Sequence, residues 1–397
     1  MTDSGLDADR LVDQAINTTG LDDFGEATWR DGLDRLVPAL RDEARLNELG
    51  EQIAIDGLVE LLTNRLTITE WRKQHPEVTT GDVVPPIVIV GQARTGTSIL
   101  YDILAQDLAT RAPLTWEVDQ PVPPPETATY DTDPRIDEVD DVLAGVDLLM
   151  PGFGTMHPMG ARLAQECARI TASDFRSVIF PTQYRVPSYA RWVLYEADMA
   201  PAYRWHRQFL QHLQSRHPAG DAPADRWLIK SPAHIWCLNE LLAEYPNALL
   251  VQTHRDPLRI IASVSSLMVM LRGMTCDDPN LPEVVGEWAE YIAEGLDRSV
   301  TAREDGTVAP GRVVDVQFED FMADPFATIG QVYDALGHEL SAESEARMRD
   351  FLAAHRQGEQ SGHQYSFADT GLDPAVWRER TRRYQEHFGV RSDPRLA

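Results

Sequence analysis

Lysine is almost missing from this 397-residue chain. Of its 36 basic residues only Lys73 and Lys230 are lysines, so the other 34 are arginines. A compositional bias toward arginine explains the general pattern without any functional role. A lysine retained against that background is of interest, because the planar guanidinium of arginine cannot replace a compact ammonium where one is needed. Lys230 follows the apolar run 227–229 and is therefore a candidate functional residue.

Cysteine and long hydrophobic runs are also scarce. The three cysteines, Cys167, Cys237 and Cys276, lack the pairing or spacing of a disulfide framework or a metal site. This pattern favours structural thiols in a reducing compartment. The N-terminus, 1–7, is acidic and has no apolar signal core, and no run approaches the roughly 18 apolar residues of a membrane span. We expect a cytoplasmic protein without a membrane span.

Positive charge is in short supply overall. Asp and Glu number 63 against 36 Lys and Arg, which gives a net charge of −27. Nucleic acids and anionic membranes need a basic protein face, so neither is an expected partner. An anionic ligand must then be bound by a small local group of cations. The hydrophobic fraction of 43% is ordinary for a globular protein and supports a sizeable core.

The most informative stretch runs from Pro85 to Ser98. Four β-branched residues, 87–90, predict a short strand buried on both faces. A loop bounded by Gly91 and Gly96 follows, and residues 99–104 have the apolar spacing of a helix. Loop amides and the positive end of a helix dipole converge in such an arrangement, which favours an anion site. The alternative is an ordinary strand-to-helix turn.

The glycine spacing of this loop is similar to that of a Walker A loop, G-x-x-x-x-G-K-[ST], with one difference. Thr97 stands at the lysine position, and the cation has moved forward to Arg94. A nucleotide triphosphatase with this sequence would lack the charge that reaches the terminal phosphates. ATP hydrolysis is therefore the less favoured use of the loop.

Further strands are predicted at 225–230, 248–254 and 312–318, with helical segments between them. This alternation predicts parallel βαβ units, hence an α/β protein with a P-loop-like parallel sheet flanked by helices. Ligands bind such sheets at the carboxyl ends of neighbouring strands. The motifs beginning at 91, 230 and 255 would all lie there, and three cationic strand ends indicate a ligand with two separate anionic groups.

The chain divides into an expected N-terminal helical region, 1–80, and a main domain, 81–397. Within the main domain, residues from about 120 to 225 mix helices with loops and are rich in aromatic residues. Aromatic side chains at helical spacing usually belong to the core, and the alternative is the lining of an apolar pocket. The residues concerned are Tyr184, Tyr189, Trp192, Tyr195, Tyr203, Trp205 and Phe209.

Arg255 and Ser263 form a second candidate anion motif. Arg255 follows the predicted strand 248–254, and Ser263 lies eight positions later, two turns into the next helix. Both can reach one phosphate, because arginine offers a planar fork and serine a short hydroxyl. Each also has a structural explanation when taken alone, Arg255 at the edge of the sheet and Ser263 as a helix-packing residue.

Together these motifs resemble the sulfotransferases that use 3′-phosphoadenosine 5′-phosphosulfate (PAPS). The loop 91–98 resembles the 5′-phosphosulfate loop of that family, and the interval from Arg255 to Ser263 resembles its 3′-phosphate motif. The order of Lys230-Ser231-Pro232, a helix, 245–248, a strand and Arg255-Asp256 is especially similar to tyrosylprotein sulfotransferases and their bacterial relatives. The resemblance covers roughly residues 84–390.

The resemblance implies a role for each matching residue. Lys230 would lie near the bridging oxygen that leaves with the product, adenosine 3′,5′-bisphosphate (PAP), where a point charge stabilises developing negative charge. Arg356 and Gly358 fall in a segment that resembles the loop closing over the 3′-phosphate. The 3′-phosphate would be bound by Arg255 and Ser263. The 5′-phosphosulfate would be bound by Gly91, Arg94, Thr95, Gly96, Thr97 and Ser98, with Arg94 also a candidate catalytic residue.

An acceptor alcohol needs a base within hydrogen-bond reach. Glu117 looks like the catalytic glutamate of the tyrosylprotein branch. His234 is its rival, because other sulfotransferases place a histidine soon after the corresponding lysine. His157 and Glu166 are outlying candidates on an expected substrate loop. For any one of them, a hydrogen-bonded structural role is the plain alternative.

The reaction implied is in-line transfer of a sulfuryl group from PAPS to a hydroxyl or amine of a small, apolar or aromatic acceptor. The 120–225 insertion would bind that acceptor. Positioning and cations held in place can suffice for this transfer, and the sequence shows no cluster of metal ligands. The alternatives are a P-loop nucleotide kinase or NTPase and a non-catalytic nucleotide-binding protein. The sequence does not indicate an oligomeric state.

Overall fold

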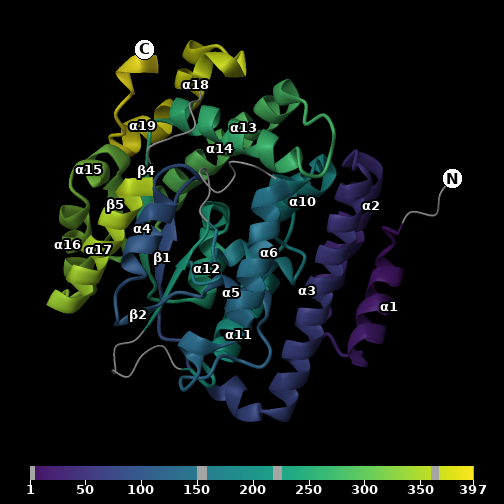
Figure 1. Ribbon diagram of the computed structural model, residues 1–397. Helices are drawn as coiled ribbons and strands as arrows, with labels where there is room; N and C mark the ends of the chain where they lie inside the picture. The colour runs from purple at the N-terminus through teal and green to yellow at the C-terminus, as the bar shows by residue number, and fades with distance from the viewer. Residues whose placement is uncertain (1–4, 150–158, 218–225, 359–365, 397) are drawn as a thin grey trace.

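The computed structural model describes residues 5–149, 159–217, 226–358 and 366–396. At its centre lies a parallel sheet of five strands in the order β2-β3-β1-β4-β5 (Figure 1). The α/β fold with a parallel sheet and an N-terminal group of helices is thus confirmed. The strands are β1 (Ile87–Val90), β2 (Thr110–Arg111), β3 (Arg226–Lys230), β4 (Leu249–His254) and β5 (Val313–Gln317).

Helices cover both faces of the sheet (Figure 1). Their bounds before β3 are α1 (Ala8–Thr19), α2 (Trp29–Glu43), α3 (Glu48–Gln74), α4 (Thr97–Leu104), α5 (Thr115–Asp119), α6 (Arg135–Leu149), α8 (Cys167–Ala172), α9 (Ile179–Gln183), α10 (Pro187–Tyr195) and α11 (Ala200–Gln214). After β3 they are α12 (Leu238–Glu244), α13 (Pro257–Arg272), α14 (Leu281–Glu304), α15 (Phe318–Ala323), α16 (Pro325–Leu336), α17 (Ala342–Gly358), α18 (Pro374–Arg380) and α19 (Arg382–Phe388). Short 3-10 helices include η1 (Pro76–Thr80) and η3 (Pro232–Trp236).

The alternation of side chains along β1 divides the core into two layers. Ile87 and Ile89 pack with residues of α4, α16 and α17 on one face of the sheet. Val88 and Val90 point to the other face, where they join a larger cluster that includes α1 to α3 and α8 to α12. All four are at most 2% exposed. A strand covered on both faces reads as a continuous apolar run, which is why the sequence predicted β1.

The N-terminal helices α1 to α3 share that larger cluster with the sheet. Leu33 on α2 and Leu62 on α3 are fully buried in it, and Val88 belongs to the same cluster. Arg65 on α3 is only 2% exposed, and its guanidinium donates to the carbonyl oxygens of Phe24 and Ser173. The helical segment that precedes the sheet therefore shares an apolar core with it, and the buried polar contact of Arg65 with Ser173 joins that segment to the region after α8.

The aromatic segment of the insertion belongs mainly to the same core. Six of the seven aromatic residues singled out in the sequence are at most 6% exposed, which matches the core interpretation. Tyr195 differs, because 44% of it is exposed. The buried six are Tyr184, Tyr189, Trp192, Tyr203, Trp205 and Phe209.

Helix α11 carries two fully buried histidines. Nδ1 of His206 is hydrogen-bonded to the Tyr245 hydroxyl at 2.6 Å, and burial lowers the pKa of His206 to about 3. His212 contacts the carbonyl oxygen of Pro121 through Nε2 at 2.8 Å, and burial lowers its pKa to about 4. Both imidazoles are therefore neutral in the folded protein at neutral pH.

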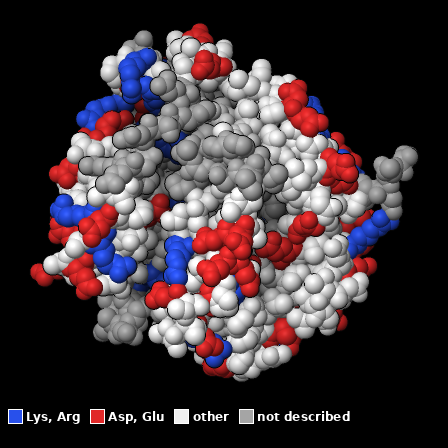
Figure 2. Space-filling model, in the orientation of Figure 1, with Lys and Arg blue, Asp and Glu red and all other residues white. Residues whose placement is uncertain are grey.

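The surface carries its negative excess without a broad basic area on the face shown in Figure 2, where Lys and Arg occur in small groups beside Asp and Glu. Among the helices of the described ranges, none is both long and apolar enough to cross a membrane.

Gly50 and Gly57, both on α3, offer a matched test of the packing. A Cβ at Gly50 would lie 2.1 Å from the carbonyl oxygen of Thr275, whereas at Gly57 it would meet nothing within 4 Å. We expect Gly50→Ala to lower the free energy of unfolding by about 1–3 kcal/mol through overpacking. Gly57→Ala should raise it by about 0.5–1 kcal/mol, because alanine is the better helix former. Urea unfolding measures both, and equal effects at the two sites would contradict this packing.

The buried histidines predict a loss of stability in acid. The unfolded chain protonates His206 and His212 below about pH 6.5, whereas the folded protein keeps them neutral down to about pH 3 and 4. The unfolded state therefore binds more protons in this window, and each histidine removes up to about 1.4 kcal/mol of stability per pH unit. Urea midpoints between pH 7.5 and 5 should fall steeply. His206→Asn should flatten that slope, and an unchanged slope would contradict the assignment.

Candidate functional site

The loop between β1 and α4 has three residues with positive φ angles, and two of them are glycines. Gly91, Arg94 and Gly96 have φ angles of 138°, 70° and 91°, in the left-handed region that residues with a Cβ rarely adopt. A Cβ at Gly91 would also lie 2.4 Å from Oγ1 of Thr253. The loop therefore presses closely against the end of β4, and α4 begins directly after it at Thr97.

Two threonines stabilise the loop from inside. The Thr95 hydroxyl donates to the carbonyl oxygen of Gln92 at 2.6 Å and lies 2.6 Å from the Thr253 hydroxyl. Thr95 is 1% exposed and Thr97 is 3% exposed, whereas Ser98 is exposed at the start of α4. The Thr95 hydroxyl is thus engaged in holding the loop, and Ser98 presents its hydroxyl at the surface of the site.

The structure brings Arg94, Arg255 and Ser263 together. Nε of Arg94 donates to Oγ of Ser263 at 2.9 Å, and Nη1 of Arg255 donates to the carbonyl oxygen of Arg94 at 2.7 Å. The Arg255 guanidinium lies over the ring of Phe318, 4.0 Å from its centroid. The two anion motifs of the sequence therefore form one continuous polar group.

Lys230 is the last residue of β3 and is 2% exposed. Its ammonium donates to Oγ of Ser98 at 3.2 Å and pairs with the carboxylate of Glu166, the residue that precedes α8. The ammonium also lies 5.5 Å from the ring centroid of Tyr101. Lys230 thus contacts the start of α4 from the neighbouring strand.

The sheet register explains why these residues meet. Ile89 of β1 pairs with Lys230 of β3, and Val90 pairs with Gln252 of β4, so three neighbouring parallel strands end at one edge. Such an edge binds ligands in open α/β sheets. It carries one cation, Lys230, beside Ser98 and two, Arg94 and Arg255, on the side of Ser263, which suits a ligand with an anionic group at each of two ends.

The C-terminal segment holds the end of β4 in place. Asp256 is fully buried, caps α13 by accepting from the amide of Leu258 at 2.9 Å, and accepts two bonds from Arg378 of α18 at 2.6 and 2.7 Å. His254 contacts the hydroxyl of Tyr384 on α19 at 3.0 Å. Arg255 therefore lies between two residues that the C-terminal helices support.

Glu117 lies on α5 and is fully buried. One carboxylate oxygen pairs with the guanidinium of Arg111, and the other accepts from the amide of Leu114 at 2.8 Å. Arg111 is itself only 6% exposed and stacks on Trp227, 4.5 Å from the ring centroid. The contacts of Glu117 are thus those of a buried structural ion pair.

His234 lies in η3 and is 2% exposed. Its Nδ1 is 2.8 Å from the Tyr203 hydroxyl. Burial, with smaller contributions from His206 and Lys230, lowers the pKa of His234 to about 3. It is therefore a neutral imidazole inside the core next to α11.

Three sequence candidates receive little or no structural description. Arg356 and Gly358 lie in the last turn of α17, and their side chains are outside the described part of the structure. His157 lies outside the described residues altogether. Sequence reasoning also missed Phe318, although its position directly after β5 is the signal that could have found it.

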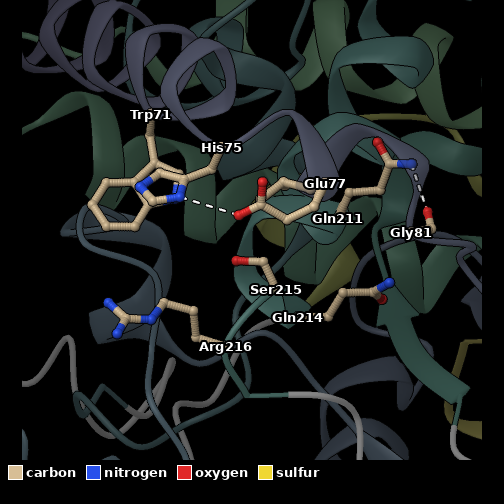
Figure 3. A pocket seen from close by; sticks show the side chains of 9 residues that line it. Trp71, His75, Glu77, Gly81, Gln211, Gln214, Ser215 and Arg216 are labelled. Carbon is tan, nitrogen blue, oxygen red and sulfur yellow. Dashed lines mark hydrogen bonds and ion pairs between the residues drawn. The ribbon is translucent and has the colours of Figure 1, made fainter.

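A separate cavity of about 490 Å³ lies beside α3 and the end of α11 (Figure 3). In it the ring of Trp71 stacks on His75 at 4.5 Å, and His75 contacts Glu77 at 3.1 Å. Gln214, which also lines it, accepts from the indole of Trp227 near the amino end of β3. This cavity is therefore not part of the cation group, which lies at the carboxyl ends of the strands.

Among the residues described here, no three His, Cys, Asp or Glu side chains are placed to hold a metal ion.

Comparisons with known proteins agree with this geometry. A sequence profile described as Sulfotransferase family matches residues 85–342. Two proteins, from Mycobacterium bovis and Mycobacterium tuberculosis and both named omega-hydroxy-beta-dihydromenaquinone-9 sulfotransferase Stf3, are 23% identical over 303 residues, which covers 76% of this chain and 75% of theirs.

Solved structures extend the comparison to nearly the whole chain. Sulfotransferase STF9 from Mycobacterium avium has a TM-score of 0.88 and 28% identity, with 99% of both chains covered. Sulfotransferase STF1 from Mycobacterium tuberculosis has a TM-score of 0.80 and 30% identity, covering 94% of this chain and 97% of the other. The profile match contains the glycine loop, Lys230, Arg255 and Ser263. With these motifs at one sheet edge and this similarity in sequence and fold, the chain belongs to the sulfotransferase family.

Proposed function

We propose that this sulfotransferase uses PAPS as its donor and transfers the sulfuryl group to a hydroxyl of a small apolar molecule. The observation that carries the proposal is the meeting of Arg94, Lys230 and Arg255 at the carboxyl ends of β1, β3 and β4. In a protein of net charge −27, such a group of cations is suited to an anionic ligand.

The residues fit the two anionic ends of PAPS. The amides of the loop from Gly91 to Ser98, the positive end of α4 and Lys230 would bind the 5′-phosphosulfate. Arg255 and Ser263 would bind the 3′-phosphate, the first with a planar fork and the second with a hydroxyl. PAPS supplies an activated sulfuryl group to this site. Arg94 belongs to the loop and connects it to the pair proposed for the 3′-phosphate, because its side chain contacts Ser263 and its carbonyl oxygen contacts Arg255.

Lys230 would stabilise the charge that develops on the leaving phosphate oxygen. A buried ammonium at a fixed position needs no rearrangement when that charge appears, and it acts more strongly than in water. Its contact with Ser98 at 3.2 Å places it beside the loop that would bind the phosphosulfate. A second lysine, Lys73, lies on α3 and pairs with Asp23 on the surface.

The acceptor is proposed to be an apolar alcohol. The Stf3 relatives are named for action on omega-hydroxy-beta-dihydromenaquinone-9, and their likeness covers 76% of this chain. The region from about 120 to 225 supplies α8 and the residue Glu166, which pairs with Lys230. We place the enzyme in a reducing cytoplasm, since Cys167, Cys237 and Cys276 are free and buried.

Calorimetric titration with PAP tests the nucleotide site without any knowledge of the acceptor. We expect tight binding by the parent and a loss of about 30- to 100-fold, or about 2–3 kcal/mol, in Arg255→Ala, because a charged partner of the 3′-phosphate is removed. Arg349→Ala is the matched control, since Arg349 pairs with Glu345 on the exposed face of α17. Binding of ATP with magnesium in preference to PAP would overturn the proposal in favour of a kinase or NTPase.

The two lysines provide a second matched pair. We expect Lys230→Met to lower kcat for sulfuryl transfer, measured as PAP formed from PAPS, by about 100- to 1,000-fold, because a hydrogen-bond donor to the developing negative charge is lost. Lys73→Met should leave kcat within about twofold of the parent, since exposed ion pairs contribute little. Turnover is measured with PAPS and a panel of apolar primary alcohols and phenols. Equal rates for the two variants would contradict the role of Lys230.

A further inference from the structure

Glu166 is the carboxylate that the structure places beside Lys230. Its side chain pairs directly with the ammonium and remains 25% exposed, whereas that of Lys230 is 3% exposed. The pair therefore joins a buried cation to an anion that faces the outside of the site. An acceptor arriving from solvent would meet Glu166 before it meets Lys230.

Two supports hold Glu166 at this position. The backbone amide of Glu166 donates to Oε1 of Gln165 at 2.8 Å. The Glu166 carboxylate makes no capping hydrogen bond to the first turn of α8. Gln165 is held in turn by its amide, which donates to the carbonyl oxygen of Pro113 at 2.7 Å. The Glu166 carboxylate is thus directed to Lys230 and not to the backbone of its own helix.

The other two candidate bases have different surroundings. Glu117 is fully buried, with one oxygen paired to Arg111 and the other bonded to the Leu114 amide. His234 is 2% exposed, and its Nδ1 contacts the Tyr203 hydroxyl. Glu117 would have to leave both partners, whereas Nε2 of His234 has no hydrogen-bond partner but is enclosed in the core, away from solvent. Glu166 is partly exposed, so it needs only to give up its ion pair with Lys230 to accept a hydrogen bond from the acceptor hydroxyl.

We propose that Glu166 is the catalytic base that takes the proton of the acceptor hydroxyl; this inference rests on the proposed sulfotransferase function. The negative groups of the donor compete with Glu166 for the Lys230 ammonium and so release the carboxylate toward the acceptor. The acceptor oxygen then forms a bond to sulfur while the bond from sulfur to the bridging phosphate oxygen breaks. The hydroxyl proton passes to Glu166, and the electron pair of the broken bond stays on the phosphate oxygen of PAP beside Lys230.

Two probe acceptors separate a base from a structural residue. 4-Nitrophenol is ionised at mildly alkaline pH and needs no base, whereas benzyl alcohol must lose its proton during the reaction. We expect Glu166→Gln to slow transfer from PAPS to benzyl alcohol by about 100-fold or more and transfer to 4-nitrophenolate by less than about tenfold. Glu166→Asp should recover part of the benzyl alcohol rate.

Glu117→Gln is the matched control. Because Glu117 is bound to Arg111 inside the protein, this variant should change both rates by the same factor. PAP calorimetry on each variant shows that the nucleotide site is intact, and a parent that fails to bind PAP would refute the proposed function itself. With PAP binding retained, equal slowing of both acceptors in Glu166→Gln, or a selective loss in Glu117→Gln, would overturn the assignment of Glu166.

Discussion

The parallel register of β3, β1 and β4 is the constraint on which the rest of the site depends. β1 is paired on both sides and buried on both faces, and this parallel pairing brings the carboxyl ends of β3 and β4 to the same edge of the sheet as its own. Most of the side chains buried within such a sheet are apolar, and ligands bind at the edge where the strands end. Lys230, the glycine loop and Arg255 are brought together by this arrangement, although the chain positions that carry them are far apart.

Placing cations side by side is unfavourable unless each has compensating contacts. The structure provides different compensating contacts for Lys230 and for Arg255. Lys230 pairs with Glu166 and lies near Tyr101, while Arg255 lies over the ring of Phe318 and donates to the Arg94 carbonyl. These contacts hold the cations in position, and in the proposed reaction the anionic donor exchanges with the Glu166 carboxylate. The C-terminal helices contribute from outside by holding Asp256, next to Arg255.

Local sequence patterns predicted the strand and helix around the glycine loop, but not the contacts of the candidate bases. The loop from 91 to 96 was predictable because glycine positions and a strand-to-helix change are local signals, and the structure confirms the strand and helix around it. β2 was missed because two residues cannot produce an apolar period. Glu117 and His234 stay untested as catalytic residues, but their partners, Arg111 and Tyr203, could not be inferred from spacing in the sequence.

The sequence by itself determined the class of fold, the glycine loop, the eight-residue interval from Arg255 to Ser263 and the interest of Lys230, since each depends on neighbouring residues or on residue type. Only the tertiary structure decided which carboxylate faces Lys230. Glu166 lies 64 positions from Lys230, whereas Glu117 lies six from the arginine that binds it. Spacing specifies secondary structure, but the pairing of buried charges depends on how distant segments pack, because a buried charge is stabilised only by the partner that the fold places within reach.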